Sequence, residues 1–145
     1  MSDPKDRPRV GIGVVIVNHQ GKILMGKRIG SHAPYYSIPG GSLDLGETFD
    51  EGAKREIKEE TNLDIENPEV IAVTNNLETY HNEGLHYISI IMLVEDFSGE
   101  LKNREPEKCA GWFWEDPKDL PRPLFEATRM AVACYLEKVV YKKLE

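Results

Sequence analysis

The sequence predicts an α/β protein in which a mixed β-sheet lies between two helices, an α/β/α sandwich. The hydrophobic period changes along the chain, so that strand-like runs, a helix, further strand-like runs and a second helix follow one another. The chain has 145 residues, the size of one ordinary domain, and has neither an internal repeat nor a linker rich in Gly or Ser. We therefore expect a single domain over residues 10–145, after a polar, proline-containing leader over residues 1–9.

The first elements are expected to be a β-hairpin and a third short strand. Val and Ile are enriched over residues 11–17, and apolar residues return over residues 22–29, after turn-forming residues. Residues 35–38 predict another strand, which Pro39 ends. The two glycines that follow permit backbone conformations that other residues avoid, so we expect a sharp turn there.

A helix is predicted over residues 48–61, where apolar residues recur every four positions: Phe49, Ala53 and Ile57. Thr48 followed three residues later by Glu51 fits a capping box at the start of the helix. Asn62 is suited to a left-handed cap at its end, with the apolar Leu63 after it.

The second half of the chain predicts more strands and a terminal helix. Residues 70–74 and 85–94 have strand-like composition, and the polar residues 78–84 separate them. A last short strand is expected over residues 111–114. A connecting segment that contains several prolines follows. The spacing of apolar residues after it predicts a helix over residues 124–142.

Composition narrows the classes of function. The net charge of −7, without a local basic patch, argues against binding to a nucleic acid duplex or a membrane surface. The apolar stretches are shorter than the ~20 residues that a membrane helix needs. Two cysteines, Cys109 and Cys134, are too few for a disulfide framework, and no apolar export signal is visible, so we expect a cytoplasmic protein.

Negative charge is concentrated around the predicted helix. Carboxylates outnumber cations between Asp44 and Glu60, and helical spacing places Glu56 beside both Glu59 and Glu60. The cluster could be a solvated acidic face. In a partly desolvated cleft, two such charges ~6 Å apart would repel by roughly 2 to 3 kcal/mol at an effective dielectric constant near 20, and a divalent cation would relieve this repulsion.

The spacing of this segment resembles the Nudix box of the Nudix hydrolases, G-x5-E-x7-R-E-U-x-E-E-x-G-U, in which U is aliphatic. Gly41, Glu47 and the run from Arg55 to Leu63 match it over residues 41–63. Asn62 departs from the pattern, which has glycine there, but asparagine also tolerates the left-handed conformation. The order of the predicted elements is similar to that of the family, whose fold is an α/β/α sandwich.

The resemblance implies cleavage of a phosphoanhydride by water with Mg²⁺ or Mn²⁺. Glu56, Glu59 and Glu60 would hold the metal, with the Gly40 carbonyl as a further ligand. A polyphosphate would be repelled by such a site unless divalent cations intervened. Glu47 and Arg55 resemble the family's structural pair between loop and helix, although an ordinary surface ion pair is the alternative.

The remaining site residues are less constrained by the pattern. Glu105 and Glu107 are both candidates for the general base, and both could equally be part of a solvated loop. Arg28 could bind phosphate, or it could cap a strand edge. Gly40 and Gly41 would let substrate and metal approach the backbone. The aromatic residues that could stack on a base, or belong to the core, are Tyr35, Tyr36, His86 and Phe125.

The stretches 26–28, 105–108 and 112–114 are similar to MutT-like members that act on nucleoside triphosphates. This resemblance implies release of a nucleoside monophosphate and pyrophosphate from a small nucleotide, and related enzymes are often homodimers. The alternatives are an ADP-ribose or nucleotide-sugar pyrophosphatase and a Nudix module that senses a nucleotide without cleaving it. Sensor modules typically lose the box carboxylates, and all of them are present here.

Overall fold

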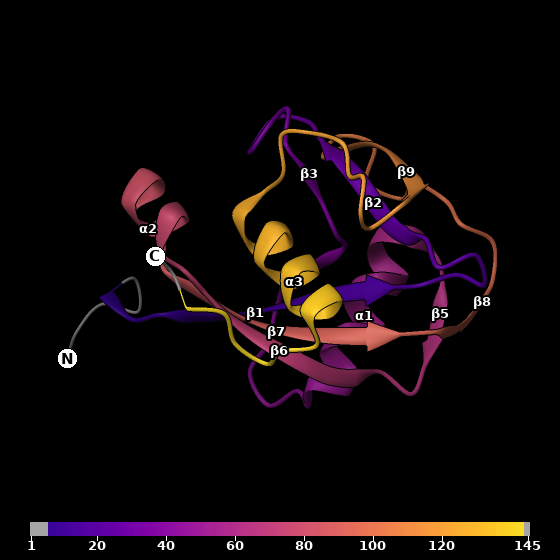
Figure 1. The fold of residues 1–145 in the computed structure, drawn as a ribbon, viewed down its shortest axis with the longest axis horizontal. Helices are drawn as coiled ribbons and strands as arrows, with labels where there is room; N and C mark the ends of the chain where they lie inside the picture. The colour runs from indigo at the N-terminus through magenta and orange to yellow at the C-terminus, as the bar shows by residue number, and fades with distance from the viewer. Residues whose placement is uncertain (1–5, 144–145) are drawn as a thin grey trace.

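The structure, a computed structural model, describes residues 6–143. Two helices, α1 (Phe49–Thr61) and α3 (Glu126–Glu137), cover opposite faces of a central sheet, with α3 in front of the sheet and α1 behind it in Figure 1. The predicted α/β/α sandwich is therefore confirmed. Of the leader expected over residues 1–9, residues 1–5 lie outside the described part of the chain, and Arg9 already belongs to the first strand.

The central sheet is mixed. Its strands are β1 (Arg9–Ile16), β4 (Gly40–Ser42), β6 (Glu69–Asn76) and β7 (Tyr87–Val94), in the order β4-β1-β7-β6. Strand β1 runs parallel to β7 and antiparallel to β4, while β6 is antiparallel to β7. Because a parallel pair needs a long crossover, the two strands that form the middle of the sheet are far apart in the sequence.

Alternation along β1 divides the core into two layers. Ile12, Val14 and Ile16 pack in one cluster with Ala53 and Ile57 of α1. Val15 and Val17 pack in the other with Ala131 and Val132 of α3. This period of two on a sheet covered on both faces explains why the strand is apolar almost throughout. The two layers fix α1 and α3 against the sheet, and with them the residues that each helix carries.

A second sheet stands beside the first. It consists of β3 (Tyr36–Ser37), β2 (Ile23–Arg28) and β9 (Cys109–Glu115), all antiparallel. A small third sheet pairs β5 (Asp64–Glu66) with β8 (Asp96–Ser98), neither of which was expected. Strand β9 is longer than the predicted 111–114.

The predicted hairpin between residues 11–17 and 22–29 is wrong. Strands β1 and β2 belong to different sheets, and only an isolated bridge between Val17 and Ile23 joins them in the described chain. The turn at residues 18–21 forms as expected, with Asn18 Oδ1 accepting from the backbone of Lys22. What the local sequence could not specify is that each strand finds a better partner elsewhere: β1 in β7, and β2 in β9.

The two glycines after Pro39 do not form only a turn, which corrects the prediction. They belong to β4, where Gly40 pairs with Gly13 of β1. A Cβ at Gly40 would overlap the carbonyl oxygen of Ile12, so glycine is needed here for close approach of two backbones rather than for a bend.

The segment between β6 and β7 forms a short helix, α2 (Leu77–Glu83), which the sequence did not predict. Asn76 at its N-terminus makes no side-chain cap. The cap comes instead from the buried Glu126 of α3, which accepts hydrogen bonds from the backbone of Glu78 and Thr79. Figure 1 shows α2 projecting from the end of the sheet, beside α3. Because Glu126, which caps this helix, is 47 residues away from Thr79 in the sequence, no local sequence pattern predicts the helix.

The predicted helix over residues 48–61 is confirmed. Thr48 and Glu51 form the complete capping box, and Asn62 adopts the left-handed cap with φ 69°. The terminal helix is shorter than the predicted 124–142, because Lys138 takes up a left-handed conformation after Glu137. No helix in the described residues is long and apolar enough to cross a membrane.

Candidate active site

Glu47 and Arg55 join the loop after β4 to α1. Arg55 donates from Nε and Nη2 to the two carboxylate oxygens of Glu47, at 2.6 and 2.9 Å, and from Nη2 to the carbonyl oxygen of Ser42 at 3.0 Å. Glu47 also accepts from the backbone N–H of Asp44 at 2.8 Å. The hydrogen bond from Arg55 is the main cause that lowers the pKa of Glu47 to about 2. The pair is a bidentate clamp between loop and helix rather than a loose surface contact.

The same guanidinium reaches two further carboxylates of α1. Its Nη1 lies 2.9 Å from Glu56 Oε1 and 3.4 Å from Glu59 Oε2. Hydrogen bonding to Glu47, followed by Glu56, raises the pKa of Arg55 above its usual value. The side chain of Glu56 is 14% exposed and that of Glu59 is 53% exposed. Arg55 thus offsets part of the repulsion among the helical glutamates, and Glu59 is the member that faces solvent most.

Glu60 lies deeper and is attached to the glycine strand. Its Oε2 accepts a hydrogen bond from the backbone N–H of Gly40 at 3.0 Å. Desolvation by burial, followed by the charge of Glu56, raises the pKa of Glu60 to about 8. Burial likewise raises the pKa of Glu56. Two neighbouring carboxylates therefore resist ionisation together, which is typical of a site prepared for a cation.

Gly41 leaves the space that the carboxylate of Glu56 occupies. A Cβ at position 41 would overlap the carboxyl group of Glu56. Because β4 pairs with β1, the glycine cannot move away without breaking that pairing. The absence of a side chain at Gly41 is therefore what lets α1 bring Glu56 against the strand.

A loop over residues 102–108 closes the C-terminal end of α1. The backbone N–H groups of Lys102 and Arg104 donate to the carbonyls of Thr61 and Glu60, and Trp112 Nε1 donates to the Glu60 carbonyl at 3.2 Å. These carbonyls are ones that a helix end leaves without an internal partner. The contacts hold Glu60 in place from behind, and sequence analysis missed this role of Trp112.

Residues of α1, β4 and the 102–108 loop enclose an acidic cavity of about 370 Å³. Of the predicted site residues, the structure brings Arg28, Gly40, Gly41, Glu56, Glu59, Glu60 and Glu105 to its wall, together with Lys108. Glu105 is close enough that its charge adds to burial in raising the pKa of both Glu56 and Glu60. Glu107 is exposed and lines no cavity that the structure describes, so the structure separates the two candidate bases.

The donors around this cavity suit a hard divalent cation. Carboxylate oxygens are the ligands that Mg²⁺ and Mn²⁺ prefer. Because Gly41 has no side chain, the carboxylate of Glu56 has room at the cavity. Among the described residues, no three His, Cys, Asp or Glu side chains already surround one point, because Glu56 and Glu59 turn toward Arg55. The residues fit the metal in kind, and Glu60 and Glu56 are the ones that could hold it inside the cavity.

A second cavity, of about 280 Å³, opens beside the acidic one. The two share Arg28, Ser37 and residues 40–42 in their walls. Ile38, Leu85 and Phe125 give the second cavity an apolar lining. A mainly apolar pocket with a few polar groups is typical of a site for a small organic ligand.

Among the aromatic candidates for base stacking, only Phe125 lines a cavity within the described residues. Tyr36 packs on the core cluster beneath α3, and the structure does not bring it to either cavity. His86 Nε2 lies 2.6 Å from Asn75 Oδ1, and Tyr35 is exposed. The predicted aromatic contribution is thus reduced to one ring.

The second cavity also has a polar wall that sequence analysis missed. Thr74 Oγ1 donates to Asn76 Oδ1 at 2.8 Å, and Asn76 Nδ2 donates to Ser89 Oγ at 2.9 Å. All three side chains are buried, and Asn76 and Ser89 line the cavity. Polar residues at alternate positions of two apolar strands were the signal available in the sequence, since such strands seldom bury hydroxyl and amide groups without a reason.

Comparison with known proteins places this geometry in a family. MutT NUDIX hydrolase from Burkholderia pseudomallei is 34% identical in sequence, and its crystal structure superposes with a TM-score of 0.81 over 88% of this chain and 98% of that one. The ADP-ribose pyrophosphatase of Methanocaldococcus jannaschii is 33% identical over 114 residues, 77% of this chain and 64% of the relative.

The chain is also similar in sequence to RNA pyrophosphohydrolases, over shorter segments. That of Orientia tsutsugamushi is 37% identical over 73 residues, 50% of this chain and 44% of the relative. That of Cereibacter sphaeroides is 39% identical over 79 residues, 54% of this chain and 49% of the relative. The chain spans about half the length of these two relatives. A family model, the NUDIX domain, matches residues 7–133, and the chain therefore belongs to the NUDIX family.

Proposed function

We propose that this protein is a Mg²⁺-dependent hydrolase that cleaves a phosphoanhydride bond of a nucleoside triphosphate and releases a nucleoside monophosphate and pyrophosphate. The observation that carries the proposal is the pair of joined cavities. One is lined by Glu56, Glu60 and Glu105, and the other is mainly apolar with a buried polar wall. A nucleotide has the same division, since its charged phosphate chain is connected through a sugar to a flat base with aromatic faces and hydrogen-bonding edges.

The shared wall sets how such a substrate would lie. Arg28 lines both cavities and is suited to hold phosphate oxygens through its planar fork. Lys108 stands at the acidic cavity and provides a second cation. The base would then enter the second cavity against Phe125, where Asn76 and Ser89 offer hydrogen-bonding groups.

Glu56 and Glu60, with Glu59 and the Gly40 carbonyl at the margin, are the residues that would hold the metal. When bound, Mg²⁺ or Mn²⁺ would neutralise phosphate oxygens and make water a better nucleophile. Glu105 faces the same cavity and is our candidate to accept the proton of the attacking water. The water oxygen becomes bonded to phosphorus while the P–O bond of the anhydride breaks, and the pyrophosphate leaves.

Arg55 and Glu47 act on this site from outside. Arg55 holds Glu47 and contacts Glu56 at 2.9 Å, so it connects the loop at residues 43–47 with the carboxylates in the cavity. Their contribution is to position α1 against β4 rather than to contact substrate.

The test is a panel of nucleotides incubated with Mg²⁺, with nucleoside monophosphate and pyrophosphate quantified separately. We expect hydrolysis of at least one nucleoside triphosphate with equal amounts of the two products, and no turnover after EDTA treatment. Release of orthophosphate instead of pyrophosphate would contradict the proposed bond of cleavage. Binding without turnover across the panel would favour a sensor module.

A second candidate is hydrolysis of ADP-ribose or a nucleotide sugar. The observation that favours it is the 33% identity to a relative named ADP-ribose pyrophosphatase, over 77% of this chain. The same panel separates the two candidates when it includes ADP-ribose. Turnover confined to ADP-ribose, with AMP and ribose 5-phosphate as products, would replace the first proposal with the second.

A further inference from the structure

The second cavity is bordered by two segments that meet in one polar contact. His32, in the loop between β2 and β3, has its Nε2 2.8 Å from both carboxylate oxygens of Glu83, the last residue of α2. Both residues line the second cavity, and neither lines the acidic one. In the part of the chain that the structure describes, this is the one hydrogen-bonded link between the 29–35 loop and α2.

The His32 ring is held from the other side as well. It packs on Phe125 with ring centroids 4.7 Å apart and a tilt of 54°, and its Nδ1 lies 3.4 Å from Ser31 Oγ. His32 has φ 63°, a left-handed conformation that is uncommon for residues with a side chain. The backbone accepts this conformation, and the result is a ring placed between Phe125 and Glu83.

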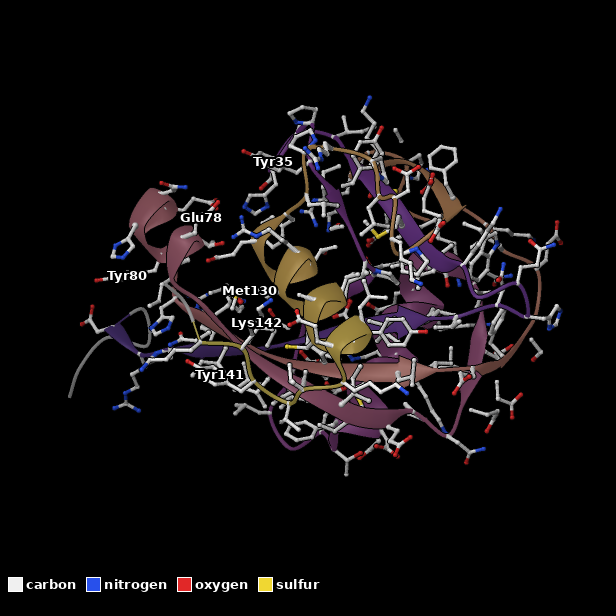
Figure 2. All side chains as sticks on the ribbon, viewed as in Figure 1. Tyr35, Glu78, Tyr80, Met130, Tyr141 and Lys142 are labelled. Atoms are coloured by element: carbon white, nitrogen blue, oxygen red, sulfur yellow. The ribbon has the colours of Figure 1, made fainter. Side chains whose placement is uncertain are left out.

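Helix α2 is anchored differently at its two ends. At the start, the buried carboxylate of Glu126 accepts from the N–H groups of Glu78 and Thr79, at 2.9 and 3.0 Å. Arg129 of α3 also contacts Glu78 at 3.1 Å. Figure 2 shows Glu78 on the side of α2 that faces α3 and Tyr80 on the outer side. Among the described residues, the last turn of α2 makes no comparable hydrogen bond or ion pair with α3. Its end contacts the 29–35 loop instead, through Glu83 and His32, at the border of the second cavity.

We propose that His32 and Glu83 form a latch that encloses the nucleoside part of the substrate in the second cavity and so determines the affinity for it. This inference rests on the proposed function, because it assumes that the second cavity receives the base. With the latch intact, the imidazole, Phe125 and α2 surround the ligand. Without it, the end of α2 and the 29–35 loop are no longer joined, and the base has one wall fewer.

The placement of the latch predicts which kinetic constant it affects. His32 and Glu83 lie outside the acidic cavity, so the groups that act on the phosphates stay in place when the latch is broken. A contact that holds the base in both ground state and transition state changes KM and leaves kcat unchanged. A ligand with phosphates and no base should not sense the latch at all.

The experiment compares His32→Ala, Glu83→Ala and the double variant, with the exposed His19→Ala and Glu66→Ala as matched controls. Kinetics are measured with the best nucleoside triphosphate of the panel, and inhibition by inorganic tripolyphosphate is measured in parallel. We expect each latch variant to raise KM about tenfold, the low end for loss of a hydrogen bond to a charged group, with kcat within about twofold. The double variant should resemble His32→Ala, because Glu83→Ala removes only the contact that His32→Ala has already removed.

Unchanged KM in both single variants would overturn the latch, as would additive effects in the double variant or an equal loss of tripolyphosphate binding. Calorimetric binding of the nucleotide provides the same comparison without turnover. If the unaltered protein hydrolyses no nucleotide, the proposed function fails, while a tenfold weaker nucleotide binding by the latch variants would still support the enclosure. Glu83→Gln keeps an acceptor for His32, and we expect its KM to lie between those of the unaltered protein and Glu83→Ala.

Discussion

The backbone N–H of Gly40 donates a hydrogen bond to the carboxylate of Glu60 across 3.0 Å, and so joins β4 to the last turn of α1. This one bond lowers the pKa of Glu60, but burial and the neighbouring Glu56 outweigh it, and the pKa of Glu60 rises to about 8. With its pKa raised to about 8, Glu60 is expected to be mainly protonated at neutral pH when no cation is bound. A divalent cation that binds Glu60 must displace this proton, which makes binding of metal and release of the proton one event.

The affinity for Mg²⁺ should therefore fall as the pH drops below about 8, the pKa of Glu60. Titration calorimetry at several pH values, in buffers with different ionisation enthalpies, measures both the affinity and the protons released. We expect close to one proton released near pH 7 and almost none near pH 9.5. Equal affinity and no proton release across this range would contradict a role for Glu60 in holding the metal.

Glu60→Gln should stabilise the metal-free protein at high pH. Burial raises the folded-state pKa of Glu60 above its ordinary value of 4.5, so the folded state binds more protons than the unfolded state, and the unaltered protein loses stability as pH rises from 4.5 to about 8. Glutamine keeps an acceptor for Gly40 and removes the charge. Each pKa unit is worth about 1.4 kcal/mol, so the shift from 4.5 to about 8 corresponds to about 5 kcal/mol at most. We expect a gain of several kcal/mol, up to about this limit, at pH 9 in EDTA, measured by urea unfolding.

In the same variant, added Mg²⁺ should no longer raise the unfolding temperature, and turnover should fall by orders of magnitude. The unaltered protein, by contrast, should become more stable as the Mg²⁺ concentration rises above the Kd for Mg²⁺. A Glu60→Gln variant that keeps full turnover would remove this residue from the metal site.

Glu105→Gln and Glu107→Gln form a matched pair that tests the general base. The two residues lie in one loop, but only Glu105 lines the acidic cavity, whereas Glu107 is exposed. General base catalysis typically contributes about 100- to 10,000-fold, so Glu105→Gln should lower kcat by at least 100-fold. Glu107→Gln should stay within about twofold. Equal effects of the two substitutions on kcat would exclude Glu105 as the base.

Glu47→Gln tests the clamp between loop and helix through its acid dependence. Hydrogen bonding from Arg55 lowers the pKa of Glu47 from 4.5 to about 2, so this pair stabilises the fold above pH 4.5, and the stabilisation is lost as pH falls toward 2. The variant should unfold at a lower temperature at pH 7 and show a smaller further loss on acidification. Glu69→Gln, at an exposed position, is the control. Parallel pH profiles for Glu47→Gln and the unaltered protein would contradict the clamp.

The parts of the fold that the sequence predicted are those specified locally. Helix α1 has its capping box, its left-handed cap at Asn62 and its apolar spacing within one short segment, and all are found in the structure. Because a helix fixes the spacing of its own side chains, the sequence alone places Glu56, Glu59 and Glu60 on one patch. The spacing to Gly41 and Glu47 then predicted the strand and loop that meet them.

The errors concern contacts between distant segments. The hairpin prediction failed because β1 pairs with β7 and not with β2, which a turn at Asn18 cannot reveal. Helix α2 was missed because its cap, Glu126, comes from another helix. The polar wall of the second cavity arises where Asn76 and Ser89 meet across the pairing of β6 with β7. In each case the deciding energy is a tertiary interaction, which local propensity does not contain.

Helix α2 sits in the connection between two paired strands, outside the elements that carry Glu56, Glu60 and Glu105. In the proposed function, the groups that act on the phosphates and part of the wall around the base therefore belong to separate segments of the chain. Exchange of residues 77–84 for another connection would leave the hydrolytic apparatus whole and give it a differently shaped neighbour. In such a protein, replacement of this one short segment would change which base or sugar fits beside the acidic cavity.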